Sequence, residues 1–154
     1  MSDAGSSEAK PKGKRRGLEG VLLLVIFAAL IGGMLYMKRP APMPEAFAKG
    51  TLAAANESAQ GKPVVAVFTA RWCGTCQGYK RGALADAAVG DWLAEHAVAV
   101  MIDIEEQPGD AELVGVSAVP TTAVLRDGQV LATQVGAMGA DRLRSWLEQT
   151  TEVK

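Results

Sequence analysis

The chain has 154 residues, of which 49% are hydrophobic and 21% are charged, with a formal net charge of −1. This length and composition allow one packed domain of ordinary size together with additional segments. The near-zero net charge argues against a nucleic-acid-binding protein, because contacts with phosphates need an excess of basic residues. The 2 cysteines and 1 histidine are too few for a disulfide-stapled scaffold or for a structural zinc site.

The first feature along the chain is an apolar segment, residues 20–37, which contains no charged side chain. As a helix it would be about 27 Å long, close to the roughly 30 Å thickness of the hydrocarbon core of a bilayer. We therefore predict a transmembrane helix over residues 18–37 that contacts lipid through residues 20–37. A buried core helix is the alternative interpretation, but soluble helices are rarely apolar on every face.

Basic residues predict the orientation of this helix in an inner (cytoplasmic) membrane. Lysine and arginine are more frequent before it, at positions 10, 12, 14, 15 and 16, than after it, at positions 38 and 39. This asymmetry keeps the N-terminus in the cytoplasm, so residues 1–17 are expected to form a disordered cytoplasmic tail and the rest of the chain to be periplasmic.

A cleaved signal peptide is a competing interpretation of the same segment. The residues Ala46-Phe47-Ala48 have the small-x-small form of a cleavage site. However, they lie well beyond the apolar segment, which is itself longer than the usual 7–15-residue apolar region of a signal peptide. An uncleaved anchor is therefore the favoured prediction.

The remaining sequence predicts a Pro-rich linker over residues 38–44 and an α/β domain over residues 45–154. The expected elements up to the middle of the domain are a helix over 45–60, a buried strand over 64–69, a helix from 73 to about 88 and a helical piece over 91–95. A second buried strand (97–104), a short helix (107–114), two strands joined by an Asp-Gly turn (121–126 and 129–135) and an amphipathic helix (140–149) follow.

Both cysteines, Cys73 and Cys76, lie just after the strand predicted over residues 64–69. At the start of the next helix, the sulfur of Cys73 would face free backbone N–H groups, which favour the thiolate and lower the thiol pKa from about 8.5. Cys76 comes one turn later on the same face, and its flanks predict burial. Cys73 is therefore the expected nucleophile, and Cys76 the residue that resolves a mixed disulfide.

Over residues 46–149 the chain resembles the thioredoxin family. The resemblance depends on Trp72-Cys73-Gly74-Thr75-Cys76 after a buried strand and on three later landmarks in the same order, Val119-Pro120-Thr121, Asp127-Gly128 and Val135-Gly136-Ala137. It implies a thioredoxin fold, a central mixed sheet flanked by helices, preceded here by one transmembrane helix. It also implies a redox-active Cys73–Cys76 disulfide, with no other cofactor and no metal.

The resemblance also implies roles for the neighbours of the cysteines. Pro120 takes the position of a cis proline beside the dithiol, where the backbone of Val119 would pair with an extended substrate. Trp72 would shield the sulfur atoms. Gly74 and Thr75 separate the cysteines without adding positive charge, which favours a reductant or a disulfide exchanger over a strong oxidant.

The sequence departs from the family pattern at two core positions. Typical members bury an acid in the strand before the motif and pair it with a lysine in the next strand. Here the corresponding residues are Val67 and Met101, both apolar. Fast general reduction of the thioredoxin type is therefore in doubt, because water or another group must take the proton from Cys76.

These features predict a membrane-tethered thiol–disulfide oxidoreductase. Its expected substrates are Cys-containing exported proteins or apocytochromes, and its expected electron donor is a membrane protein. One alternative is a Cu(I)-binding module, since Cu(I) accepts two thiolates. The other is a non-catalytic thioredoxin-like adaptor in which the two sulfur atoms form a static disulfide.

Overall fold

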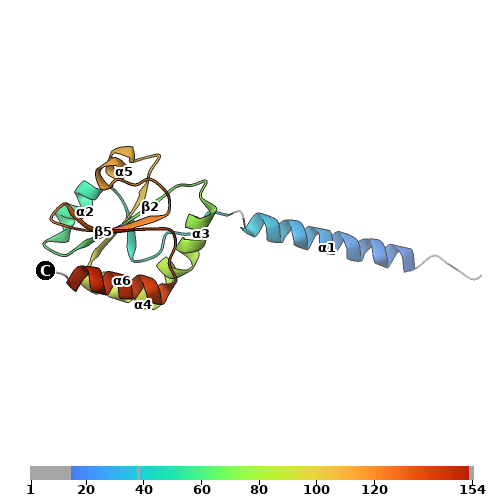
Figure 1. Ribbon diagram of the computed structural model, residues 1–154. Helices are drawn as coiled ribbons and strands as arrows, with labels where there is room; N and C mark the ends of the chain where they lie inside the picture. The colour runs from blue at the N-terminus through green and yellow to red at the C-terminus, as the bar shows by residue number, and fades with distance from the viewer. Residues whose placement is uncertain (1–14, 38, 153–154) are drawn as a thin grey trace, which may run out of the picture. The chain divides into compact units, whose positions relative to one another are not determined.

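The computed structural model describes residues 15–37 and 39–152, which belong to two compact units separated after Arg39. The first unit contains helix α1, Arg15–Met37 (Figure 1). Within α1, Glu19–Tyr36 has a mean hydropathy of 2.1 and is 0% buried, so it is not a core helix. By length and composition this helix is able to span a membrane, although a signal sequence has the same properties. Helix α1 includes residues 15–17 of the predicted tail, and residues 1–14 lie outside the described residues.

The second unit, from Pro40 onward, is built on a five-stranded mixed sheet with the strand order β1-β3-β2-β4-β5. Strands β1 and β2 run parallel to β3, whereas β4 is antiparallel to both β2 and β5. The strands are β1 Phe47–Lys49, β2 Val64–Thr69, β3 Val98–Asp103, β4 Thr121–Arg126 and β5 Gln129–Val135.

Helices cover both faces of this sheet, as Figure 1 shows with α2 and α5 on one side and α4 and α6 on the other. The helices of the second unit are α2 Leu52–Ala59, α3 Gly74–Arg81, α4 Ala87–His96, α5 Pro108–Val114 and α6 Ala140–Glu152, with a 3₁₀ turn η1 at Ala83–Ala85. The architecture agrees with the mixed sheet flanked by helices that the sequence predicts.

The central strand β2 divides the core into two layers. All six of its residues are buried, as expected for a continuous apolar run. Because side chains alternate along a strand, Val65 and Val67 pack with α3, α4 and α6, while Phe68 and its even-numbered neighbours pack with α2 and α5. The start of α3 is therefore fixed on a sheet that is packed from both sides.

The helix predicted over residues 45–60 is wrong in its first half. Residues 47–49 form β1, which pairs with the edge of β3, and Phe47 is buried in the core. The helix begins only at Leu52, after Thr51, whose hydroxyl accepts a hydrogen bond from the N–H of Ala54. The Ala-rich composition favours helix, but strand pairing and burial of Phe47 outweigh this local preference.

The helix predicted from residue 73 to about 88 is in fact two helices. Helix α3 ends at Arg81, and Gly82 closes its last turn by donating to the carbonyl of Gly78. Asp86 then caps a new helix, because its Oδ1 accepts hydrogen bonds from the N–H groups of Ala88 and Val89. The piece predicted over residues 91–95 is the second half of this helix, α4.

The C-terminal half of the domain agrees more closely with prediction. The bounds of β4 and β5 are those expected, and the turn between them has Asp127 and Gly128 in the left-handed region, with φ of 52° and 77°. Helix α6 continues past its predicted end at residue 149 to Glu152.

Residues 40–44 of the predicted Pro-rich linker belong to the second unit and pack within it. The N–H of Ala41 donates a hydrogen bond of 2.7 Å to Oε1 of Gln77, and Pro44 is buried. Gln77 lies in α3, so the segment that follows α1 contacts the helix that carries the cysteines.

Candidate active site

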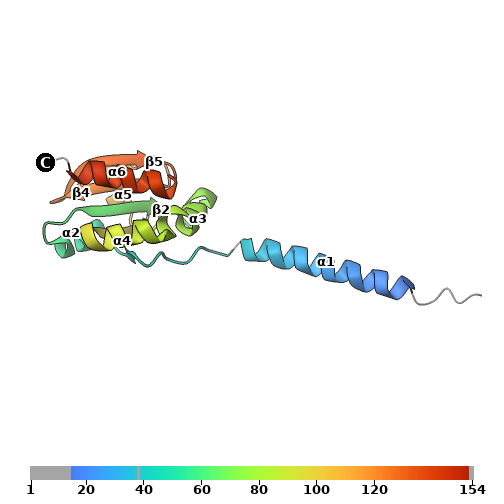
Figure 2. The same cartoon turned by 90° about the horizontal axis from the view of Figure 1, so that it is seen from below.

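The candidate nucleophile lies where β2 leads into α3, and Figure 2 shows β2 running toward this helix. Cys73 is the N-cap residue of α3, and its Sγ accepts a hydrogen bond of 3.1 Å from the N–H of Cys76. This is the contact that the sequence predicts for a sulfur at the positive end of a helix. A backbone N–H and the helix dipole aimed at Sγ both favour the thiolate form of Cys73.

The two cysteines form a disulfide whose Cα atoms are 5.2 Å apart, so the structure shows the oxidised form. Cys76 is only 1% exposed, in agreement with its predicted burial, and Cys73 is 6% exposed. Ala70 packs with both cysteines, and the side chains of Ile104 and Val119 pack against this cluster. An attacking thiolate therefore reaches the pair through Cys73 more readily than through Cys76.

The loop before β4 lies directly beside Cys73. The Val119–Pro120 peptide bond is cis, as the resemblance implies, and the carbonyl oxygen of Val119 is 3.7 Å from Sγ of Cys73. The carbonyl of Pro120 accepts a hydrogen bond of 2.8 Å from Gly136. Among the residues that the structure describes, no acceptor faces the N–H of Val119, so this amide can pair with an extended chain.

The remaining predicted site residues lie on the surface around the disulfide. Trp72 is 68% exposed, so its ring faces mainly solvent, and the covering of the sulfur atoms comes from Ala70, Ile104 and Val119. Gly74 and Thr75 are exposed in the first turn of α3. The structure thus brings the predicted site residues into one region at the start of α3.

Comparison with known proteins supports this arrangement. The family profile described as a thioredoxin-like domain matches residues 52–151. The chain belongs to this family of thioredoxin-like proteins. The match covers both cysteines, the cis proline and every strand except β1.

Two similar proteins are named thioredoxin. A thioredoxin from Rhodospirillum rubrum is 35% identical over 81 residues, which are 53% of this chain and 75% of that protein. A thioredoxin from Malassezia sympodialis is 37% identical over 78 residues, 49% of this chain and 70% of that protein.

A solved structure shows the same fold. A mutant thioredoxin from Halobacterium salinarum NRC-1 superposes with a TM-score of 0.54 at 28% identity, over 76% of this chain and 95% of that one. The second unit therefore has the thioredoxin fold. Family membership and the Cys73–Cys76 disulfide together support thiol–disulfide oxidoreductase activity.

The thioredoxin-like core lacks an acid and a lysine at the two positions noted above. Val67 and Met101 are partners in the β2–β3 register and are 1% and 2% exposed, so this pair is entirely apolar. A polar pair lies nearby, because the hydroxyls of Tyr79 in α3 and Thr122 in β4 are 3.3 Å apart and buried. Thr122 is also the register partner of Val67 on β4.

The Tyr79 hydroxyl is neutral in the folded protein. Burial raises the pKa of Tyr79, and the hydrogen bond with Thr122 opposes this effect only in part. Our sequence analysis missed this pair. The sequence feature that could have indicated this pair is the position of the two residues. Tyr79 lies one helical turn after Cys76, and Thr122 lies two residues after the cis proline.

Several charged residues lie on and around α3. Lys49 forms an ion pair of 2.7 Å with Glu106, and this contact, mainly its hydrogen bond, holds the pKa of Glu106 below its usual value. In α3 itself, burial lowers the pKa of Lys80. Among the described residues there is no cluster of three or more His, Cys, Asp or Glu residues able to hold a metal ion.

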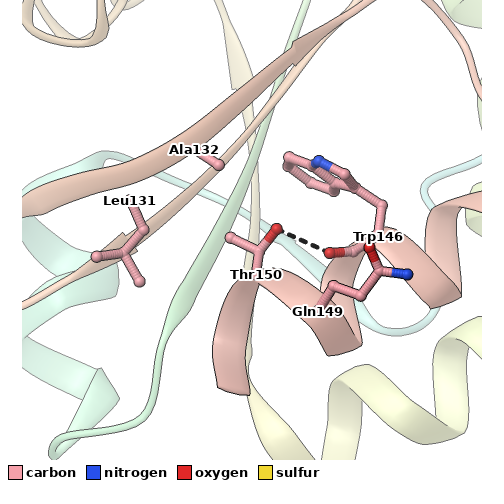
Figure 3. A pocket seen from close by; sticks show the side chains of 5 residues that line it. All are labelled: Leu131, Ala132, Trp146, Gln149 and Thr150. Atoms are coloured by element: carbon pink, nitrogen blue, oxygen red, sulfur yellow. Dashed lines mark hydrogen bonds between the residues drawn. The ribbon is translucent and has the colours of Figure 1, made fainter. Parts of the chain in front are cut away.

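A shallow pocket lies elsewhere on the domain. Its lining comes from β5 and α6, and Thr150 within it donates a hydrogen bond of 2.8 Å to the carbonyl of Trp146 (Figure 3). The lining residues are Leu131, Ala132, Trp146, Gln149 and Thr150. Because it contains neither cysteine nor Pro120, this pocket is not part of the dithiol site.

Proposed function

We propose that the protein is a membrane-tethered thiol–disulfide oxidoreductase that reduces or exchanges disulfides in extracytoplasmic proteins. The observation that carries the proposal is the hydrogen bond from the N–H of Cys76 to Sγ of Cys73 at the start of α3. In the reduced protein the same donor stabilises the Cys73 thiolate, which is the form that attacks disulfides.

The reaction proceeds in two exchanges. The Cys73 thiolate attacks one sulfur of the substrate disulfide, forming a mixed disulfide and releasing the other substrate sulfur as a thiolate. Cys76 then loses its proton and attacks Sγ of Cys73, which expels the second substrate thiolate. The substrate gains two electrons, and the protein is left with the Cys73–Cys76 disulfide that the structure shows.

Substrate recognition would use the backbone next to the disulfide. The unpaired N–H of Val119, fixed in position by the following Pro120, is suited to bind a main-chain carbonyl of an extended segment. The exposed ring of Trp72 adds an apolar contact. Contacts of this type select for a flexible chain around a cysteine and depend little on its sequence.

The two residues between the cysteines favour reduction or exchange over strong oxidation. Gly74 and Thr75 add no positive charge beside Cys73 beyond the helix dipole. A thiolate that is stabilised only moderately favours a reductant or an exchanger, because strong oxidants of this fold depend on a strongly stabilised reduced form.

Helix α1 would hold the domain at an inner membrane, with the N-terminus in the cytoplasm. Its length and hydropathy support this proposal, as does the excess of basic residues on its N-terminal side. The substrates would be exported proteins with cysteines, including apocytochromes. A membrane protein would have to supply the electrons, because a periplasm kept oxidising would otherwise leave the pair as a disulfide.

An insulin-reduction assay tests the oxidoreductase activity. With dithiothreitol as electron donor, we expect the wild-type chain to accelerate insulin precipitation and Cys73→Ser to abolish the acceleration, because the attacking thiolate is gone. Cys76→Ser should instead accumulate a mixed disulfide at Cys73, visible as a mass shift that a reductant removes. Equal rates for the wild type and Cys73→Ser would refute the proposal.

A redox titration separates the enzyme from an adaptor. A reduction potential above about −300 mV fits an exchangeable pair, whereas a lower value fits a static structural bond. Titration of the reduced chain with Cu(I) addresses the remaining alternative, since a Cu(I)-binding module would retain stoichiometric copper through two thiolates.

A further inference from the structure

The face of the sheet beneath α3 changes from apolar to polar close to the cysteines. Val67 of β2 is paired with Met101 of β3, and the next pair on the same face consists of Thr69 and Asp103. This pair lies at the ends of both strands, just before the loop that leads to Cys73. An acidic residue is therefore present on this face, displaced by one pair along the strands and located on β3.

Thr69 makes this polar pair unusual. Its side chain is 3% exposed, and its Oγ1 is buried without a hydrogen-bond partner among the described residues. An unpartnered buried hydroxyl is costly unless a water or another ligand satisfies it. Asp103 is half-buried and accepts a hydrogen bond of 3.0 Å from the N–H of Glu105.

Lys80 faces the same region from α3. It follows Cys76 by one helical turn, and residues at this spacing lie side by side on a helix, with Cβ atoms about 5–6 Å apart. The Lys80 side chain is half-buried, and no carboxylate of the described residues is within 4.0 Å of its nitrogen. Its cation is therefore available to a charge that forms at Cys76.

The charges that act on Lys80 come from two strands. Desolvation by burial is the largest effect and lowers the pKa of Lys80. The negative charge of Asp103 in β3 raises this pKa, and the positive charge of Lys49 in β1 lowers it further. Lys49 is itself paired with Glu106, and the positive charge of Arg71 also lowers the pKa of Glu106. Asp103 thus favours the protonated form of Lys80 without forming an ion pair with it.

We infer that Lys80 is a positioning residue for the second exchange, in which its ammonium group stabilises the Cys76 thiolate that attacks the mixed disulfide. This inference rests on the proposed function. Cys76 is deprotonated to solvent, its thiolate forms a bond with Sγ of Cys73, and the bond from Cys73 to the substrate sulfur breaks. The substrate leaves as a thiolate and takes up a proton from water.

The attack by Cys76 can be isolated by mixing the reduced full-length chain with excess dithiobis(nitrobenzoate) in a stopped-flow instrument. Attack by Cys73 releases the first thionitrobenzoate at a rate that depends on reagent concentration. Attack by Cys76 releases the second at a rate that does not. We expect Lys80→Met to slow the second phase about tenfold at pH 7 and to leave the rate of the first phase unchanged. The midpoint of the curve of second-phase rate against pH should rise by about one pH unit.

Matched variants separate this effect from changes in folding and net charge. Lys80→Arg should restore the rate, because it retains a cation, and Arg142→Met, which removes an exposed cation on α6, should leave both phases unchanged. Lys80→Gln serves as the second neutral variant if Lys80→Met melts at a lower temperature than the wild type.

An unchanged second phase and midpoint in the folded neutral variants would overturn the inference, as would equal slowing by Arg142→Met. Failure of the proposed function has a different signature. In that case the wild-type chain itself would show no second phase and would not reduce insulin.

Discussion

At the scale of single residues, the chemistry depends on the contrast between Cys73 and Cys76. They are three positions apart, yet Cys73 caps α3 with its sulfur toward a backbone N–H, whereas Cys76 is buried beneath it. The spacing in the sequence predicts this division of roles, because a strand followed by a helix leaves only one orientation for the pair. The apolar Val67 and Met101 are also readable from sequence, but the polar residues around them are not.

A first prediction concerns Tyr79 and alkaline pH. Its folded-state pKa is raised above the unfolded value of 10.0. The resulting stabilisation is complete below pH 10 and is lost as the pH rises from there toward the folded pKa. Over that window the wild type should lose up to about 1.4 kcal/mol of unfolding free energy per pH unit relative to Tyr79→Phe.

Urea unfolding between pH 8 and pH 11 measures this difference. Parallel curves for the wild type and Tyr79→Phe would show that the hydroxyl ionises as freely in the folded chain as in the unfolded chain.

At the scale of helices and strands, capping residues decide where α3 and α4 separate. Gly82 closes the end of α3, and Asp86 starts α4 by accepting two backbone hydrogen bonds. This break matters for the site, because it leaves α3 as a short helix whose first turn holds the disulfide. Gly82 and Asp86 can be read from the sequence. However, the helical pattern continues across them, so the sequence alone predicts one helix in place of α3 and α4.

A second prediction tests this cap. Asp86→Ala should lower the unfolding free energy by about 1 kcal/mol, because the N–H groups of Ala88 and Val89 lose their acceptor. Asp91→Ala, which changes an exposed residue inside the same helix, should cost much less. The urea midpoints of the two variants provide the comparison, and equal losses would mean that Asp86 has no capping role.

At the scale of the whole molecule, the chain combines an apolar helix with a thioredoxin-like domain in two separate units. The proposed membrane role of α1 rests on its composition and exposure, since Glu19–Tyr36 is uncharged after its first residue and 0% buried. Retention of this helix would keep the dithiol at a surface and restrict its partners to those that reach the membrane.

A third prediction concerns this anchor. In cells, the wild-type chain should remain with membranes after alkaline carbonate extraction and keep its N-terminal residues, as judged by intact mass. The double variant Leu24→Arg and Phe27→Arg should move to the soluble fraction, because two central arginines cost about 5–7 kcal/mol on insertion scales. Tyr36→Arg, near the end of the segment, should remain in the membrane fraction.

Detection of the wild-type chain in the soluble fraction, or of a mass that lacks residues up to 48, would favour a cleaved signal peptide. Insulin reduction by the double variant would remain at the wild-type rate, since its substitutions lie in the first unit and both cysteines in the second.

The sequence by itself determined the order of most elements, the dithiol and the apolar helix, because each depends on local spacing or composition. The cis proline was implied by the resemblance to thioredoxins and not by spacing or composition. Only the tertiary structure showed β1, since its pairing with β3 joins segments far apart in the chain. The same is true of Thr69 and Asp103, whose proximity depends on the register of two strands. Periodicity reports which face of an element is buried, but it carries no information about which distant residues share that face.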